Sequence, residues 1–187
     1  MKTKTLFSAV IFYLLIFNIT TNLSYSQEPA AKADQPLIEI KTIPLQQTII
    51  MKAEVPTKDI GRKMGEMYST LFSYAGQNNI QPTGAPFAVY YTFDPKGNTS
   101  FEVGFPVASK INGSDSISYK EFPAMKVVSS LYKGSYENMM TIYTQLQDYI
   151  KKNDLKTNGA SWEVYLTDPQ QVTNPNDNQT LIYFPIE

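Results

Sequence analysis

Phe87-Ala88-Val89-Tyr90 and Trp162-Glu163-Val164-Tyr165 are two stretches of the chain that match each other at an offset of 75 residues. Four further pairs match in the same order along the chain: Ile43-Pro44 with Phe122-Pro123, Thr83-Gly84 with Asn158-Gly159, Asp94-Pro95 with Asp168-Pro169, and Phe105-Pro106-Val107 with Phe184-Pro185-Ile186. The offset of the first and last of these pairs is 79. Such an ordered series predicts an internal duplication, with one repeat over residues 37–107 and a second over residues 117–187.

Each repeat carries the same series of secondary-structure patterns. Alternating apolar residues predict strands over 37–43, 48–55, 87–93 and 101–107, and then over 117–122, 125–132, 162–167 and 180–186. Apolar residues three or four positions apart predict one helix over 60–75 and another over 139–150. We interpret both helical stripes, including Tyr143, as core. The expected fold class is α+β: two strand-helix-strand-strand repeats with pseudo-two-fold symmetry, a mostly antiparallel sheet and one long helix per repeat.

The composition excludes several kinds of chemistry. The 187 residues include no Cys and no His, which excludes disulfides, thiolate or imidazole metal ligands, an axial haem histidine and every Ser-His-Asp or Cys-His arrangement. With 16 basic and 17 acidic residues, the formal net charge is −1, so we expect no nucleic-acid partner. We expect neither a cofactor nor a metal ion, and we assign a catalytic role to no residue. The sequence leaves the oligomeric state open.

Residues 1–26 have the pattern of an export signal. Lys2 and Lys4 are basic, residues 6–19 are almost all apolar, and Ser24-Tyr25-Ser26 offers small residues for cleavage. A retained membrane anchor is the alternative, but this run of 14 residues is shorter than the roughly 20 residues that span a bilayer. We therefore expect a periplasmic or extracellular protein with no membrane partner after cleavage, in which residues 27–36 form a linker.

Glu163 is the main candidate for a binding residue. On a strand, side chains alternate between faces, so Glu163 and Tyr165 share one face while Trp162 points to the other. The first repeat has Ala88 at the position of Glu163. If this face lines the junction between the repeats, a buried carboxylate needs hydroxyl donors or a cation beside it. A solvated glutamate, or one paired with a lysine, is the alternative that the sequence leaves open.

Three other tyrosines lie on elements that could border the same junction: Tyr90, Tyr136 and Tyr183. An aromatic wall of this kind attracts organic cations. Glu102 also stands where the second repeat has an apolar residue, Leu181. Two interpretations of Glu102 are open, a residue that serves the cleft and a solvated charge at the edge of the sheet, and we favour the second.

Four motifs together resemble a GyrI-like, or AraC-type, effector-binding domain: Gly134-Ser135-Tyr136-Glu137, Trp162-Glu163-Val164-Tyr165 with Asp168-Pro169, residues 101–107, and Tyr183-Phe184-Pro185-Ile186. The likeness covers roughly residues 37–187. It implies paired strand-helix-strand-strand units around a cleft that takes small cationic or aromatic molecules, with a glutamate at the position of Glu163. No helix-turn-helix pattern precedes the domain, so we do not expect a role in transcription.

The sequence therefore predicts an exported domain that binds an amphipathic, cationic or aromatic small molecule in a cleft between the repeats. The candidate ligand-binding residues are Glu163, Tyr165, Tyr90, Tyr136 and Tyr183. A structural or protein-interaction module is one alternative. A hydrolase with Glu163 as general base is another, because some relatives open strained rings with a pocket glutamate.

Overall fold

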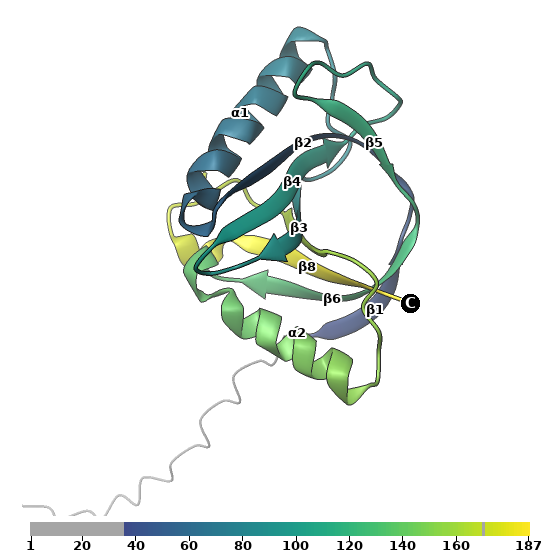
Figure 1. The fold of residues 1–187 in the computed structure, drawn as a ribbon, viewed down its shortest axis with the longest axis vertical. Coiled ribbons are helices and arrows are strands. Elements are labelled where there is room, and N and C mark those ends of the chain that lie inside the picture. Colours follow the sequence, from purple (N-terminus) through teal and green to yellow (C-terminus); the bar gives the residue numbers. More distant parts are fainter. Residues whose placement is uncertain (1–35, 170) are drawn as a thin grey trace, which may run out of the picture. The chain divides into compact units, whose positions relative to one another are not determined.

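The computed structural model of the chain describes residues 36–169 and 171–187 (Figure 1). Its strands are β1 (Ile38–Ile43), β2 (Gln46–Pro56), β3 (Phe87–Phe93), β4 (Asn98–Pro106), β5 (Ser118–Phe122), β6 (Met125–Lys133), β7 (Ser161–Tyr165) and β8 (Gln179–Ile186). The helices are α1 (Ile60–Gln77) and α2 (Met140–Lys152), and short turns of 3-10 helix are η1 (Thr57–Asp59), η2 (Tyr136–Asn138) and η3 (Pro175–Asp177). The predicted signal over 1–26 and almost all of the predicted linker over 27–36 lie outside the described residues.

The strands form one eight-stranded sheet in the order β1-β6-β8-β7-β3-β4-β2-β5. Every pair of neighbours in this sheet is antiparallel. Each repeat contributes one long helix after its second strand. The α+β fold class is therefore confirmed, and in this part of the chain neither helix is long and apolar enough to cross a bilayer.

The register of the sheet reproduces the offsets seen in the sequence. Thr48 pairs with Pro106 in the first repeat, and Val127 pairs with Pro185 in the second, each shifted by 79 residues. At the centre, Ala88 on β3 pairs with Glu163 on β7. Because these two residues are equivalent to each other, the pseudo-two-fold axis passes between them. Glu163 therefore lies at the seam where the repeats meet.

The two repeats exchange their first strands, which the sequence patterns do not reveal. β1 pairs with β6 of the second repeat, and β5 pairs with β2 of the first. The registers are equivalent, since Ile43 lies opposite Met125 and Phe122 lies opposite Gln46. Each repeat thus completes the sheet of the other.

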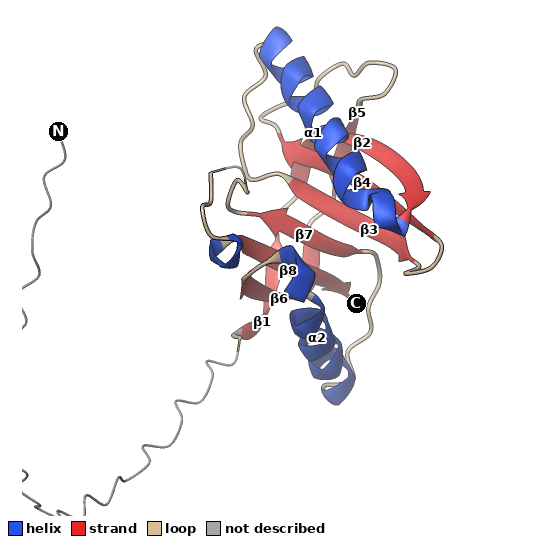
Figure 2. Cartoon of the chain, turned by 90° about the vertical axis from the view of Figure 1, so that its left-hand side faces the viewer, coloured by secondary structure: helices blue, strands red, loops and turns tan. Residues whose placement is uncertain are grey.

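Both helices cover the same face of the sheet (Figure 2). α1 buries Met67, Leu71 and Ala75 against β2 and β4, and α2 buries Ile142, Leu146 and Ile150 against β6 and β8; these sets sit at the spacing of one helical face. The opposite face carries a separate apolar cluster that includes Phe87, Phe122, Trp162 and Tyr183. Glu163 pairs with Ile182, which packs in the α2 cluster, so its side chain belongs to the helix-covered face.

Candidate functional site

Glu163 is a buried carboxylate at the seam between the repeats. The residue is 8% exposed. Its place on β7 puts the side chain on the helix-covered face, next to the small Ala88 of β3. Because Ala88 has only a methyl group, the space at the pseudo-axis is left to the carboxylate of one repeat alone.

Three phenols donate hydrogen bonds to this carboxylate from three different elements. The Tyr143 hydroxyl of α2 donates to Oε1 at 2.8 Å. The Tyr165 hydroxyl of β7 donates to Oε2 at 2.7 Å, and the Tyr90 hydroxyl of β3 donates to the same oxygen at 3.3 Å. Tyr90 and Tyr165 are equivalent positions, as are Tyr68 and Tyr143. The Tyr68 hydroxyl donates instead to the backbone carbonyl of residue 87, at 2.7 Å.

Burial governs the electrostatics of the cluster. It raises the pKa of Glu163 above the ordinary value for a glutamate, while the hydrogen bonds from the three phenols lower the pKa and offset part of this rise. Burial and the nearby carboxylate also raise the pKa values of Tyr90, Tyr143 and Tyr165, so these hydroxyls remain neutral donors. Within residues 36–169 and 171–187, no lysine or arginine forms an ion pair with Glu163.

Glu102 shows how the same protein pairs a buried carboxylate internally. It is 0% exposed and lies on the opposite face of the sheet. The Lys120 ammonium of β5 donates to its Oε1 at 2.5 Å, and the Tyr91 hydroxyl donates to the same oxygen at 2.5 Å. Lys52 lies 3.8 Å from Oε2. The interpretation of Glu102 as a solvated edge charge is therefore wrong, because β4 lies inside the sheet and Lys120 reaches it from another strand.

Aromatic rings surround the Glu163 cluster. The Tyr165 ring meets the Tyr68 ring edge to face at 6.3 Å and the Tyr136 ring edge to face at 6.0 Å. Phe72 stacks on Phe105 at 5.1 Å. Tyr136 and Phe72 are 41% and 46% exposed, so they form an aromatic rim at the surface above the buried tyrosines.

Four of the five predicted site residues lie together. Tyr90 and Tyr165 bond to Glu163, and Tyr136 packs on Tyr165. The structure does not bring Tyr183 to this cluster. Tyr183 pairs with Trp162, so its side chain lies on the opposite face, and we remove it from the candidate site.

The sequence analysis did not identify two members of the cluster, Tyr143 and Tyr68, as site residues. Both lie on helices, where a tyrosine among apolar residues has the spacing of a core residue. One signal could have identified them: they are 75 positions apart, the same offset that separates Tyr90 from Tyr165.

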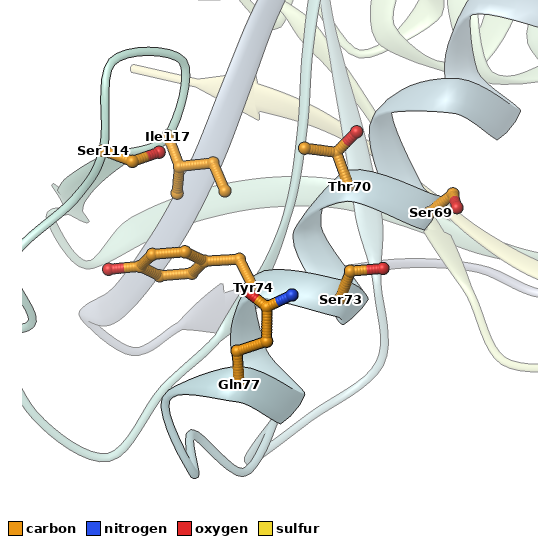
Figure 3. Close-up of a pocket in the computed structure, with 7 residues that line it drawn as sticks. All are labelled: Ser69, Thr70, Ser73, Tyr74, Gln77, Ser114 and Ile117. Carbon is orange, nitrogen blue, oxygen red and sulfur yellow. The ribbon is translucent and has the colours of Figure 1, made fainter.

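Two surface pockets lie away from the seam. One, of about 360 Å³, is lined mainly by uncharged polar residues of α1, including Ser69, Thr70 and Ser73 (Figure 3). Another, of about 380 Å³, lies beside α2 around Gln147 and Phe184. Neither offers a buried charge that would select a ligand. No three acidic side chains gather into a candidate metal site in the described part of the chain.

Comparison with known proteins identifies a family. The model of the GyrI-like small molecule binding domain matches residues 37–187. A search of curated proteins gave no match.

Solved structures share the fold at low sequence identity. The EcmrR C-terminal domain has a TM-score of 0.68 and 20% identity, over 81% of this chain and 98% of that one. In the cryo-EM structure of the EcmrR–DNA complex the TM-score and identity are the same, but this chain spans only 57% of the EcmrR chain. A hydrolase from Listeria innocua has a TM-score of 0.59 and 9% identity, over 80% of this chain and 91% of that one. SAV2435 bound to tetraphenylphosphonium has a TM-score of 0.56 and 10% identity, over 81% and 94%.

Proposed function

Because the chain belongs to the GyrI-like small molecule binding domain family, we propose that its ligand is an organic cation with aromatic groups, which binds at the seam with Glu163 as its counterion. One observation carries the proposal: the carboxylate is buried among phenols and has no cationic partner in the described residues. Glu102 provides the contrast, because Lys120 already neutralises it.

The energetics favour a cation at this position. Removing a carboxylate from water costs several kcal/mol, which hydrogen bonds from neutral phenols offset only in part. Two unit charges about 4 Å apart attract by about 4 kcal/mol at an effective dielectric constant of about 20. Each aromatic face in contact with the cation adds about 0.5–2 kcal/mol. A ligand with one positive charge and aromatic groups therefore uses both features of the site.

The hydrogen-bond pattern also indicates binding rather than catalysis. The two oxygens of Glu163 already accept three O–H donors, so the carboxylate is poorly placed to take a proton from water as a general base. The same pattern favours a cation that donates no hydrogen bond, such as a quaternary ammonium or phosphonium. Since Glu163 is 8% exposed, side chains above it must move to admit the ligand.

Tetraphenylphosphonium is a suitable probe, because a structure of similar fold, SAV2435, is described as bound to it. Tetraphenylborate is the matched control, since it has nearly the same size and shape and the opposite charge. We expect calorimetry to show saturable binding of the phosphonium and no binding of the borate.

Variants of the chain complete the test. Glu163→Gln should lower the affinity for tetraphenylphosphonium by about 30- to 1,000-fold, which corresponds to about 2–4 kcal/mol of lost charge attraction. Glu39→Gln is the matched control, because Glu39 is an exposed residue of β1, where it pairs with Lys41. Equal binding of the two probes, or equal affinity in Glu163→Gln and the wild type, would contradict the proposal. Binding of neither probe would favour the protein-interaction alternative.

We further propose that the protein works outside the cytoplasm. The support is the pattern of residues 1–26, with its basic start, apolar run and small residues before Gln27.

A further inference from the structure

β1 is an edge strand with one open side. Among residues 36–169 and 171–187, β6 is the only strand that pairs with it (Figure 2). The backbone N–H and C=O groups on the outer side of β1 can therefore pair with a further strand. The pairing with β6 has no bulge and the strand contains no proline, so two features that commonly protect a sheet edge are absent.

Apolar side chains are exposed at this edge. Ile40 pairs with Val128 of the α2 cluster, so it lies on the helix-covered face, where it is 41% exposed. Leu37, just before β1, is 79% exposed. The Ser130 hydroxyl donates to the Leu37 carbonyl at 3.0 Å and holds this residue beside β6. An open edge with exposed apolar side chains favours association with another strand.

The two charges of β1 select the partner and the register. Glu39 and Lys41 lie on the opposite face of the sheet, with Lys41 Nζ 2.7 Å from Glu39 Oε1. If two β1 strands pair antiparallel with Ile40 opposite its own copy, each Glu39 lies opposite Lys41 of the other strand. Shifting the partner by two residues would place Glu39 opposite Glu39, or Lys41 opposite Lys41, which is unfavourable. Shifting it by one would bring different faces of the two sheets together.

We propose that two copies of the chain associate through β1, antiparallel and about a two-fold axis at Ile40, so that their sheets become continuous. In this arrangement Leu37 lies opposite Ile43 of the second copy, and Ile38 lies opposite Thr42. Every side chain of the strand thus meets a matching one, as a closed two-fold interface requires. The strands β6 and β8 separate β1 from Glu163 on β7, so the dimer leaves both ligand sites unchanged.

The other edge strand, β5, does not offer the same match. At the offset of 79, Ser118 and Lys120 are equivalent to Glu39 and Lys41, so the same self-pairing would place each Lys120 opposite a serine. Lys120 is also already paired with Glu102. A contact between β1 and β5 of different copies therefore lacks reciprocal charge pairs, and association closes at two copies.

Sedimentation equilibrium measures the association. An edge contact is smaller than a standard interface, so we expect a dimer Kd on the order of 10 μM, and unfolding studied at lower protein concentration concerns the monomer. Glu39→Lys and Lys41→Glu each place like charges opposite and should raise this Kd at least tenfold. An equimolar mixture of these two variants has opposite charges at both positions and should dimerise like the wild type. Glu66→Lys is the matched control, because Glu66 is an exposed residue of α1 that pairs with Arg62, and its Kd should not change.

A single thiol tests the register. The chain has no cysteine, so Ile40→Cys introduces one thiol, and the two copies of it should lie opposite each other at the axis. A short bis-maleimide should link this variant into a covalent dimer. Thr42→Cys is the control, because its two thiols should lie about 14 Å apart along the strands. A wild-type monomer at 100 μM, growth beyond two copies, no dimer in the mixture, or equal linking of both thiol variants would overturn the proposal, and none of these results bears on phosphonium binding.

Discussion

Glu163→Gln should make the empty protein more stable at neutral pH, although the substitution weakens the proposed binding. The ionised carboxylate is buried without a cationic partner in the described residues. The glutamine oxygen can accept from Tyr165 and Tyr90, and its NH₂ group can donate to the Tyr143 hydroxyl. The substitution thus removes a buried charge without leaving a phenol unpaired.

The size of the effect follows from two opposing contributions. Burying the charge costs several kcal/mol, and the two short bonds, from Tyr143 and Tyr165, each return about 1.5–3 kcal/mol as bonds to a charged group. Because burial raises the pKa of Glu163 on balance, the cost exceeds the return, and each unit of pKa rise corresponds to about 1.4 kcal/mol. We therefore expect Glu163→Gln to raise the free energy of unfolding by about 1 kcal/mol above the folded-state pKa of Glu163.

The pH dependence gives the sign of the effect. Burial raises the pKa of Glu163 in the folded state, so the folded protein holds this proton at pH values where the unfolded chain has released it. The contribution of Glu163 to stability is fully present below the unfolded-state pKa and is lost as pH rises through the folded-state pKa. The advantage of the glutamine variant should therefore grow over that window and disappear in acid.

Urea denaturation of the wild type, Glu163→Gln and the control Glu39→Gln at several pH values measures this difference. A glutamine variant that is less stable than the wild type at pH 8, or an offset that does not change with pH, would refute the reasoning. The first result would mean that the phenols stabilise the carboxylate by more than its burial costs, and the second that they offset this cost in full.

Three other predictions follow from the contacts. Tyr165→Phe should destabilise the protein at pH 8 by about 1–3 kcal/mol in denaturant titrations, and Tyr90→Phe by less, because its bond to the carboxylate is long. Lys120→Met removes the closer of the two lysines that pair with the buried Glu102 carboxylate and should lower the free energy of unfolding by up to about 3–5 kcal/mol without changing phosphonium affinity; no loss of stability would show that Lys52 alone neutralises Glu102. The mature protein recovered from an expressing cell should begin at Gln27 by N-terminal sequencing, whereas an intact Met1 would contradict export.

Much of the fold was predictable because the repeat and its alternation are local patterns. The expected helices over 60–75 and 139–150 correspond to α1 and α2 with end differences of one or two residues. The exchange of β1 and β5 was not predictable, because an alternating strand has the same pattern whichever partner it pairs with. Strand pairing depends on the whole sheet, which the residues of one strand do not specify.

The candidate site, like the fold, was predictable only in part. Strand alternation placed Glu163 and Tyr165 on one face, and the structure has both there. Strand alternation could not show on which face of the sheet Tyr183 lies, because this depends on the pairing of Tyr183 with Trp162. Tyr143 has the same spacing as a core residue, so a helical stripe alone cannot separate a packing tyrosine from one that donates to a buried carboxylate.

The carboxyl ¹³C chemical shift of Glu163, followed by NMR against pH with and without tetraphenylphosphonium, measures the protonation of this group directly. An empty carboxyl should titrate above the ordinary glutamate pKa, and its pKa should fall once the cation is bound. If the pKa of Glu163 in the empty protein is ordinary or lowered, and saturating probe does not change it, the claim that Glu163 is a buried carboxylate that binds a cation is contradicted.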